Sequence, residues 1–210
     1  MKNLLFHLPN QLTLARIVLS FVFMGVFFSG IPFAYTFSLI LFLLAGLTDM
    51  LDGRIARSRG LENDFGKLMD PLADKILIST AFISFVQLRE TEIAAWMVVL
   101  IIAREFLITG LRLFAMSKGQ LIAAGIWGKH KAVSQIFAIC LVLTFLSFKE
   151  IIQKFPGVVG HWDEKFSSFY YSVYHVAIGW TMAVVVGLTL LSGILYVYQN
   201  RSLFILTRSS

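Results

Sequence analysis

Long apolar stretches separated by short polar segments run along the chain from about residue 12 onward. A helix needs about 20 mostly apolar residues to cross the hydrocarbon core of a bilayer. Six stretches approach this length, some by including polar residues at one end, and their apolar residues lie all round the helix. A backbone in lipid must satisfy its own hydrogen bonds, which favours helices. The pattern predicts an all-α, polytopic membrane protein with six transmembrane helices, at about residues 12–28, 33–47, 71–86, 93–114, 132–148 and 173–198.

Composition supports the membrane prediction. Hydrophobic residues fill 58% of the 210 positions and charged residues 14%, whereas soluble domains average about 45–50% and 25%. The single cysteine, Cys140, excludes an internal disulfide. Neither an internal repeat nor an extramembrane domain is found, so residues 1–210 are interpreted as a single membrane domain. Because Arg16 interrupts the first apolar stretch, that stretch is expected to be a retained span and not a cleaved signal peptide.

Basic residues are divided unequally between the two sets of connecting segments. Since Lys and Arg favour cytoplasmic loops, the richer set is expected to face the cytoplasm, with both termini inside a cell inner (cytoplasmic) membrane. Orientation thus accounts for the net charge of +6, and no nucleic-acid partner is expected. The longest outer connection, about 149–172, is interpreted as an interfacial loop or short surface helix. The richer set holds Lys2, Arg54, Arg57, Arg59, Lys67, Lys118, Lys129, Lys131, Arg201 and Arg208, against Arg89, Lys149, Lys154 and Lys165.

Four carboxylates flank the connection between the second and third spans. Asp49 and Asp52 are three residues apart at the end of one span, and Asp70 and Asp74 are four apart at the start of the next. Residues at these spacings share a helix face, so two neighbouring helices can present all four at one site on the membrane edge. Such charges repel strongly unless they are protonated or held by cations. A merely solvated loop is the alternative, but acidic residues near a span end are usually functional.

The ligand chemistry of this cluster favours hard cations. Carboxylate oxygens suit Mg²⁺ or Mn²⁺, and four of them can hold two ions about 3.5–4 Å apart, as in phosphoryl chemistry. Zinc is disfavoured because no Cys or His accompanies the aspartates. Arg57 can bind a phosphate with two parallel N–H donors of its guanidinium, and Gly53, Ala56 and Gly66 leave room for a ligand near the helices.

The segment from Asp49 to Asp74 resembles the signature of the CDP-alcohol phosphotransferase family, DxxDGxxAR-x8-GxxxDxxxD. Every fixed position matches, including the eight-residue gap at 58–65. The opening motif, Pro9 to Arg16, is similar to the PNxxTxxR start of these enzymes.

Two later motifs are similar to patterns of one bacterial subfamily, whose acceptor is sn-glycerol 3-phosphate. Ala103-Arg104-Glu105, followed by Leu111-Arg112, looks like an ARE…LR pattern. The segment 128–131 is similar to the start of a GKxKT pattern, but Ala132 stands where that pattern usually has Thr.

The resemblance implies a CDP-alcohol phosphotransferase fold, commonly a homodimer, with its site open to the cytoplasm. It implies transfer of the phosphatidyl group from CDP-diacylglycerol to the acceptor, with release of CMP and without a covalent enzyme intermediate. Asp49, Asp52 and Asp70 are the implied metal ligands, and Asp74 is the candidate general base that also contacts a metal. For Asn10, capping the N-terminus of a helix and contacting the donor are two alternatives of equal weight. The implied CDP-diacylglycerol contacts are Gly53, Ala56, Arg57 and Gly66, followed by Asn10, Thr13 and Asn63.

A dianionic acceptor needs fixed positive charge. Arg104 lies near the middle of the fourth predicted span, where a basic residue should face a polar cavity or a carboxylate such as Glu105. The alternatives are a structural ion pair for Arg104 and simple membrane anchoring for the basic residues that begin the fifth span. Lys75 is expected to snorkel towards the surface or join the site. We predict that the phosphate binds to Arg104, Arg112, Lys129 and Lys131.

Three other functions stay open at this point. The same chemistry could use another acceptor, such as inositol phosphate, serine or a second lipid, because the signature does not specify the alcohol. A cation transporter could use the acidic cluster as its path. A membrane scaffold without activity is the third possibility.

Overall fold

A computed structural model describes the backbone of residues 8–59, 64–117, 126–155 and 164–201. Within these ranges it also describes the side chains, except those of residues 8–13, 48–59, 64–71, 74, 117 and 126–127. Within these ranges the chain is all-helical and has no strand, which confirms the predicted all-α class. The helices are α1 (Leu8–Phe28), α2 (Ala34–Arg59), α3 (Asp64–Gln87), the 3-10 turn η2 (Arg89–Thr91), α4 (Ala95–Ser117), α5 (Ile126–Lys154) and α7 (Glu164–Gln199).

Two of the described helical segments have both the length and the apolar composition of a membrane span. These are Gly128–Lys154 within α5 and Glu164–Gln199, which is the whole of α7. Shorter apolar segments occupy Leu14–Phe28, Ala34–Leu47 and Lys75–Gln87. Helix α4 is long enough but carries Arg104, Glu105 and Arg112. The predicted set of six spans is therefore not confirmed by the helices themselves.

Several helices extend beyond their predicted apolar stretches. Helix α2 continues to Arg59, and α3 begins at Asp64, so Pro71 lies inside a helix that was expected to start there. A proline removes only one backbone donor, and the helix can continue past it when the neighbouring turns are held. The outer connection predicted at about 149–172 is wrong over most of its length, because α5 reaches Lys154 and α7 begins at Glu164. Hydropathy detects only the apolar part of a helix, so the predicted stretches end before the helices do, where the helices continue through polar residues.

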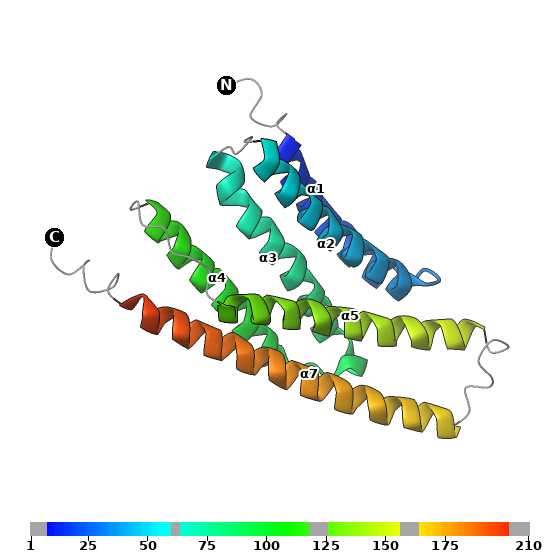
Figure 1. Ribbon diagram of the computed structural model, residues 1–210. Helices are drawn as coiled ribbons and strands as arrows, with labels where there is room; N and C mark the ends of the chain where they lie inside the picture. Colours follow the sequence, from blue (N-terminus) through cyan, green and yellow to red (C-terminus); the bar gives the residue numbers. More distant parts are fainter. Residues whose placement is uncertain (1–7, 60–63, 118–125, 156–163, 202–210) are drawn as a thin grey trace.

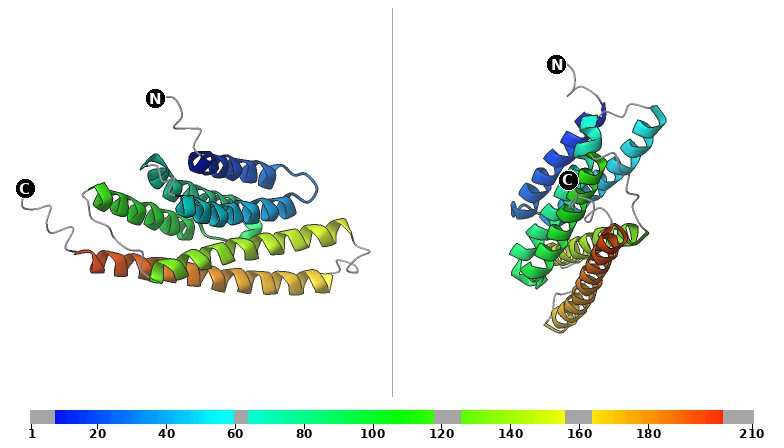
Figure 2. Two further views of the ribbon diagram at one scale, coloured as in Figure 1. Left: turned by 45° about the horizontal axis from the view of Figure 1, so that its top comes forward. Right: turned by 90° about the vertical axis from the view of Figure 1, so that its left-hand side faces the viewer.

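The helices form two groups that meet along α2 and α3 (Figure 1). Helix α1 packs against both α2 and α3, and α4 contacts α3 and α7. Helices α5 and α7 lie side by side as a long pair, and α5 also packs against α2 (Figure 2). This arrangement brings α3, α4 and α5 close enough to share side-chain contacts.

Aromatic side chains fill the core where α1, α2 and α3 meet. The ring of Phe27 of α1 stacks on that of Phe23 and is tilted against that of Phe85 of α3, with 5.8 Å between the ring centroids in each pair. Phe82 lies edge-on to Phe85 at 6.3 Å. All four rings are at most 3% exposed. Aromatic pairs at such distances add about 0.5–1.5 kcal/mol each beyond simple burial.

A carboxylate of α5 joins the two groups of helices at the end where α2 begins. Glu150 accepts backbone hydrogen bonds from Ala34 and Tyr35, the first residues of α2, at 3.2 Å each. An anion at a helix N-terminus pairs with its unsatisfied amides and its positive dipole end. The Thr36 and Ser147 hydroxyls, 2.6 Å apart, continue this contact one turn further. The end of α2 that carries the aspartate signature is therefore the opposite one.

Replacing Phe85 by alanine should lower the free energy of unfolding by about 3 kcal/mol, because a fully buried ring leaves a cavity among rigid neighbours. The same substitution at Phe169, which is 67% exposed on α7, should change it by less than about 0.5 kcal/mol. Denaturant unfolding in lipid bicelles measures both. Equal losses in the two variants would contradict the described core.

Candidate functional site

The two helices that carry the aspartate signature are continuous through it. Helix α2 includes Asp49, Asp52, Gly53 and Ala56 at spacings that recur on one helix face, followed by Arg57. Helix α3 includes Gly66, Asp70 and Asp74 within its first three turns. Because α3 begins soon after α2 ends, both signature segments lie at one end of the bundle (Figure 1), and α1 packs against both helices.

The side chains of the signature lie outside the described part of the structure. The same holds for the side chains of Asn10 and Thr13 in α1 and for the whole of Asn63. Among the side chains that are described, no group of three or more His, Cys, Asp or Glu is placed to hold a metal ion. The predicted metal ligands and nucleotide contacts are thus untested and stay predictions.

A buried carboxylate with four polar neighbours lies close to the signature segment of α3. Glu105 of α4 is 3% exposed, and its Oε1 accepts hydrogen bonds from Lys131 Nζ and, at 3.3 Å, from Gln135 Nε2. Arg104 Nη1 lies 3.5 Å from the same oxygen. Lys75 Nζ lies 3.2 Å from the other oxygen, Oε2. We call these five side chains the Glu105 cluster.

Three helices supply the Glu105 cluster. Lys75 belongs to α3 and directly follows Asp74, the candidate base. Lys131 and Gln135 are one turn apart on α5, so both meet the same carboxylate of α4. One anion therefore fixes α3, α4 and α5 relative to one another beside the end of the signature.

Basic side chains gather around Glu105. Lys75, Arg104 and Lys131 all lie against its carboxylate. Buried charges are costly unless they are paired, and the carboxylate pairs with each of these three cations. Cations held in fixed positions are the groups that an anionic ligand such as a phosphate needs.

Arg104 is held against α7. Its Nε is buried and has no hydrogen-bond partner among the described residues. A Cβ placed on Gly193 of α7 would lie 3.3 Å from Arg104 Cγ, so the glycine makes room for the arginine side chain. Tyr196, one turn further along α7, lies within electrostatic range of both Arg104 and Arg112.

The structure places the predicted phosphate ligands in two groups. Arg104 and Lys131 meet at Glu105, although Arg104 and Glu105 are neighbouring helix positions that point about 100° apart. Lys129 and Arg112 are exposed and do not belong to the Glu105 cluster. Their predicted contact with the acceptor is not tested by these positions.

Sequence reasoning missed one member of the cluster and left another open. Lys75 was expected either at the surface or in the site, and it is in the cluster. Gln135 was not considered, although it stands four residues after Lys131, where a shared helix face could have signalled it. Arg16, which ends the opening motif, is buried in α1.

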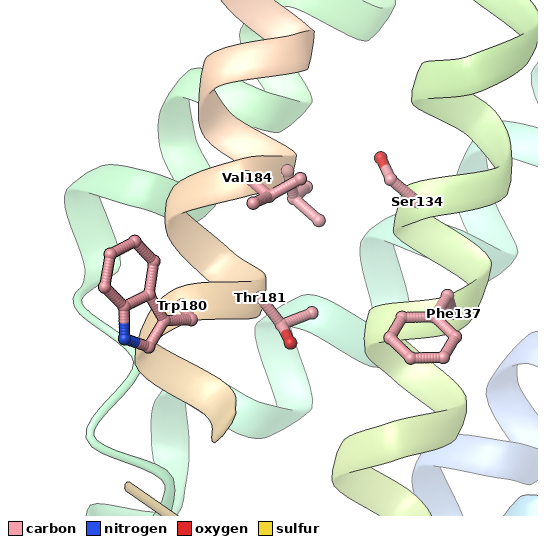
Figure 3. A pocket seen from close by; sticks show the side chains of 6 residues that line it. Ser134, Phe137, Trp180, Thr181 and Val184 are labelled. Atoms are coloured by element: carbon pink, nitrogen blue, oxygen red, sulfur yellow. The ribbon is translucent and has the colours of Figure 1, made fainter. Parts of the chain in front are cut away.

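An apolar cavity of about 200 Å³ opens between α5 and α7. Figure 3 shows Ser134 and Phe137 of α5 opposite Trp180, Thr181 and Val184 of α7. Trp180 and Phe137 are largely exposed, at 72% and 59%. No residue of the cavity lining belongs to the Glu105 cluster or to the predicted site.

The chain matches the model of the CDP-alcohol phosphatidyltransferase family over residues 6–185. It therefore belongs to this family, and the assignment predicted from the aspartate signature is confirmed. Among the described helices, the match covers α1 to α5 in full and the first three fifths or so of α7. Membership favours an enzyme over the transporter and the scaffold.

Several similar proteins are named as enzymes that form phosphatidylglycerophosphate or transfer a phosphatidyl group to glycerol 3-phosphate. The CDP-diacylglycerol–glycerol-3-phosphate 3-phosphatidyltransferase of Bacillus subtilis is 43% identical over 151 residues, covering 66% of this chain and 77% of that protein. The protein of that name from Rickettsia bellii is 37% identical over 137 residues, covering 65% and 75%. A probable phosphatidylglycerophosphate synthase of Mycobacterium tuberculosis is 38% identical over 144 residues, covering 67% and 68%.

Replacing Lys131 by methionine should destabilise the protein by about 1–3 kcal/mol, because it removes the buried ammonium group that donates to Glu105 Oε1. Lys129→Met is the matched control, since that side chain is exposed, and it should change the free energy of unfolding by less than about 0.5 kcal/mol. Heat or denaturant unfolding in detergent micelles compares the two. A similar effect of both substitutions would contradict the buried ion pair.

Proposed function

We propose that this chain transfers the phosphatidyl group of CDP-diacylglycerol to sn-glycerol 3-phosphate, giving phosphatidylglycerol phosphate and CMP. The Glu105 cluster carries the proposal, because three basic side chains gather there and one of them, Lys75, directly follows the candidate base on α3. The names of the relatives from Bacillus subtilis and Rickettsia bellii support the same donor and acceptor.

The acceptor phosphate is proposed to bind at the Glu105 cluster. Arg104 supplies the unpaired Nε donor, and Lys131 supplies a buried ammonium group. Electrostatic attraction is stronger there than in water because the surroundings are poorly polarisable. Glu105 holds the cations in place before the substrate arrives, so little reorganisation is needed when it binds. Lys129 and Arg112, which are exposed, are proposed to attract the acceptor from solution.

The four signature aspartates are proposed to hold two Mg²⁺ or Mn²⁺ ions. Their type fits, since carboxylate oxygens at three- and four-residue spacing now lie on continuous helices. Such ions neutralise charge on a phosphoryl group and on its leaving group. The assigned ligands are Asp49, Asp52, Asp70 and Asp74.

Asp74 is proposed to take the proton of the attacking hydroxyl. The acceptor oxygen forms a bond to the phosphatidyl phosphorus, the bond from that phosphorus to CMP breaks, and CMP leaves as an anion. A free aspartate is a weak base for an alcohol, so positioning supplies much of the rate. The donor is proposed to contact Gly53, Ala56, Arg57 and Gly66, with Asn10, Thr13 and Asn63 nearby.

The membrane arrangement follows from the same reasoning. We propose six spans, formed by the apolar parts of all six α-helices, within one domain over residues 1–210. The signature end is proposed to face the cytoplasm in a cell inner membrane, because the set of connections richer in Lys and Arg includes the one between α2 and α3. The nucleotide then binds at the polar rim while the acyl chains stay in lipid. A homodimer is proposed from the family resemblance.

An assay of the purified protein with labelled CDP-diacylglycerol tests this function. We expect CMP release with sn-glycerol 3-phosphate, its loss on chelation by EDTA, and recovery on adding Mg²⁺. Asp74→Asn should lower kcat by about 10²–10⁴-fold with an unchanged unfolding profile. Glu164→Gln, at an exposed position on α7, is the control and should keep full activity. CMP release with inositol phosphate or serine but not with glycerol 3-phosphate would overturn the acceptor assignment.

Gly193→Leu should raise KM for sn-glycerol 3-phosphate by about 10-fold or more, because the new side chain displaces Arg104 and weakens a charge-assisted hydrogen bond. Gly187→Leu is the matched control on the same helix, because a Cβ there meets no atom within 4 Å. Its KM should stay within about twofold of the parent. A larger effect at Gly187 than at Gly193 would argue against Arg104 as a phosphate ligand.

A further inference from the structure

Two polar atoms of the Glu105 cluster are buried without a hydrogen-bond partner among the described residues. They are Oε1 of Gln135, whose side chain is 0% exposed, and Nε of Arg104. Both side chains also approach the same carboxylate oxygen, Glu105 Oε1, at 3.3 Å and 3.5 Å. The unpaired acceptor and the unpaired donor therefore belong to neighbouring groups.

The orientation of the Gln135 amide is determined by Glu105. An amide oxygen and nitrogen are assigned from their surroundings, and here only the nitrogen can donate to the carboxylate. The reversed amide would bring two oxygen atoms together. Gln135 Oε1 therefore points away from Glu105 Oε1, and as an atom that can only accept it requires a donor.

Buried amide oxygens are rarely left unpaired in folded proteins, since the lost hydration is costly. Three oxygens of α7 are also buried without a partner among the described residues, but they are hydroxyls that can either donate or accept: Tyr174 Oη, Thr189 Oγ1 and Tyr196 Oη. Gln135 Oε1 is more informative because it requires a hydroxyl or amine, and Arg104 Nε beside it requires an acceptor. A small molecule with a hydroxyl close to an anionic oxygen satisfies both.

We propose that Gln135 is a specificity-determining residue that accepts a hydrogen bond from the non-reacting hydroxyl of the acceptor. This inference rests on the proposed function. In sn-glycerol 3-phosphate, the C2 hydroxyl lies between the primary C1 hydroxyl, which is the less hindered nucleophile, and the phosphate on C3. With the phosphate on Arg104, the C2 hydroxyl donates to Gln135 Oε1. Glu105 serves as the positioning residue, because it holds the amide in the accepting orientation.

The consequence is discrimination against acceptors that lack this hydroxyl. A site built to bind a hydroxyl group rejects an analogue without it, because the buried partner is left unpaired. The analogue is 3-hydroxypropyl phosphate, which keeps the primary hydroxyl and the phosphate and lacks only the C2 hydroxyl. For a single hydrogen bond we expect a preference of about 10- to 100-fold in kcat/KM for sn-glycerol 3-phosphate.

The test compares kcat/KM for the two acceptors in the full-length protein and in Gln135→Met, which keeps the length of the side chain and removes its polar atoms. The variant should lose about 10- to 100-fold with sn-glycerol 3-phosphate and less than about threefold with 3-hydroxypropyl phosphate. Ile136→Met, at an exposed neighbouring position of α5, is the control and should keep the parent's preference.

Three outcomes would contradict the proposal in distinguishable ways. An equal loss with both acceptors assigns Gln135 a structural role only. Equal kcat/KM for the two acceptors in the unmodified protein overturns the inference without any variant, so the test does not depend on whether Gln135→Met folds. Absence of CMP release by the unmodified protein with sn-glycerol 3-phosphate, but release with another alcohol, would overturn the proposed function and the inference with it.

Discussion

The buried carboxylate of Glu105 is the contact on which the described part of the site depends. It forms ion pairs with Lys75 of α3, with Lys131 of α5 and with its own neighbour, Arg104, so one anion holds three helices together. Ions removed from water are costly, and removing one partner of a buried pair leaves the other uncompensated. The Glu105 carboxylate therefore holds three cations in a fixed arrangement. Cations held in this way suit an anionic ligand.

This cluster and the aspartate signature have opposite charge and adjoin along α3. Lys75 contacts Glu105, and the residue before it is Asp74, the proposed base. In the proposed reaction the acidic signature would hold the metal ions beside the lipid-linked pyrophosphate, and the basic cluster would hold the acceptor phosphate, so each would neutralise a different substrate. Continuous helices through the signature provide the rigid support that such a pairing requires.

Much of this arrangement could be predicted from the sequence because strong patterns signalled it. The apolar stretches predicted the helical class, and the aspartate spacing predicted the family. The limits of the helices could not be read in the same way, since α2, α3, α5 and α7 continue through polar residues that hydropathy excludes. Gln135 was missed because an uncharged amide has no signal of its own in an apolar stretch. Its importance depends on a carboxylate thirty positions earlier, which only tertiary packing brings within reach.

Equilibrium binding of sn-glycerol 3-phosphate tests the central claim most directly, because it separates acceptor recognition from catalysis. The measurement uses the Asp74→Asn protein in lipid nanodiscs, with Arg104→Gln added in one variant and Arg89→Gln, at an exposed position of η2, added in the control. The account predicts that Kd rises by about 10-fold or more with Arg104→Gln and stays within about twofold with Arg89→Gln. An unchanged Kd in the Arg104 variant would contradict the assignment of the acceptor phosphate to the Glu105 cluster.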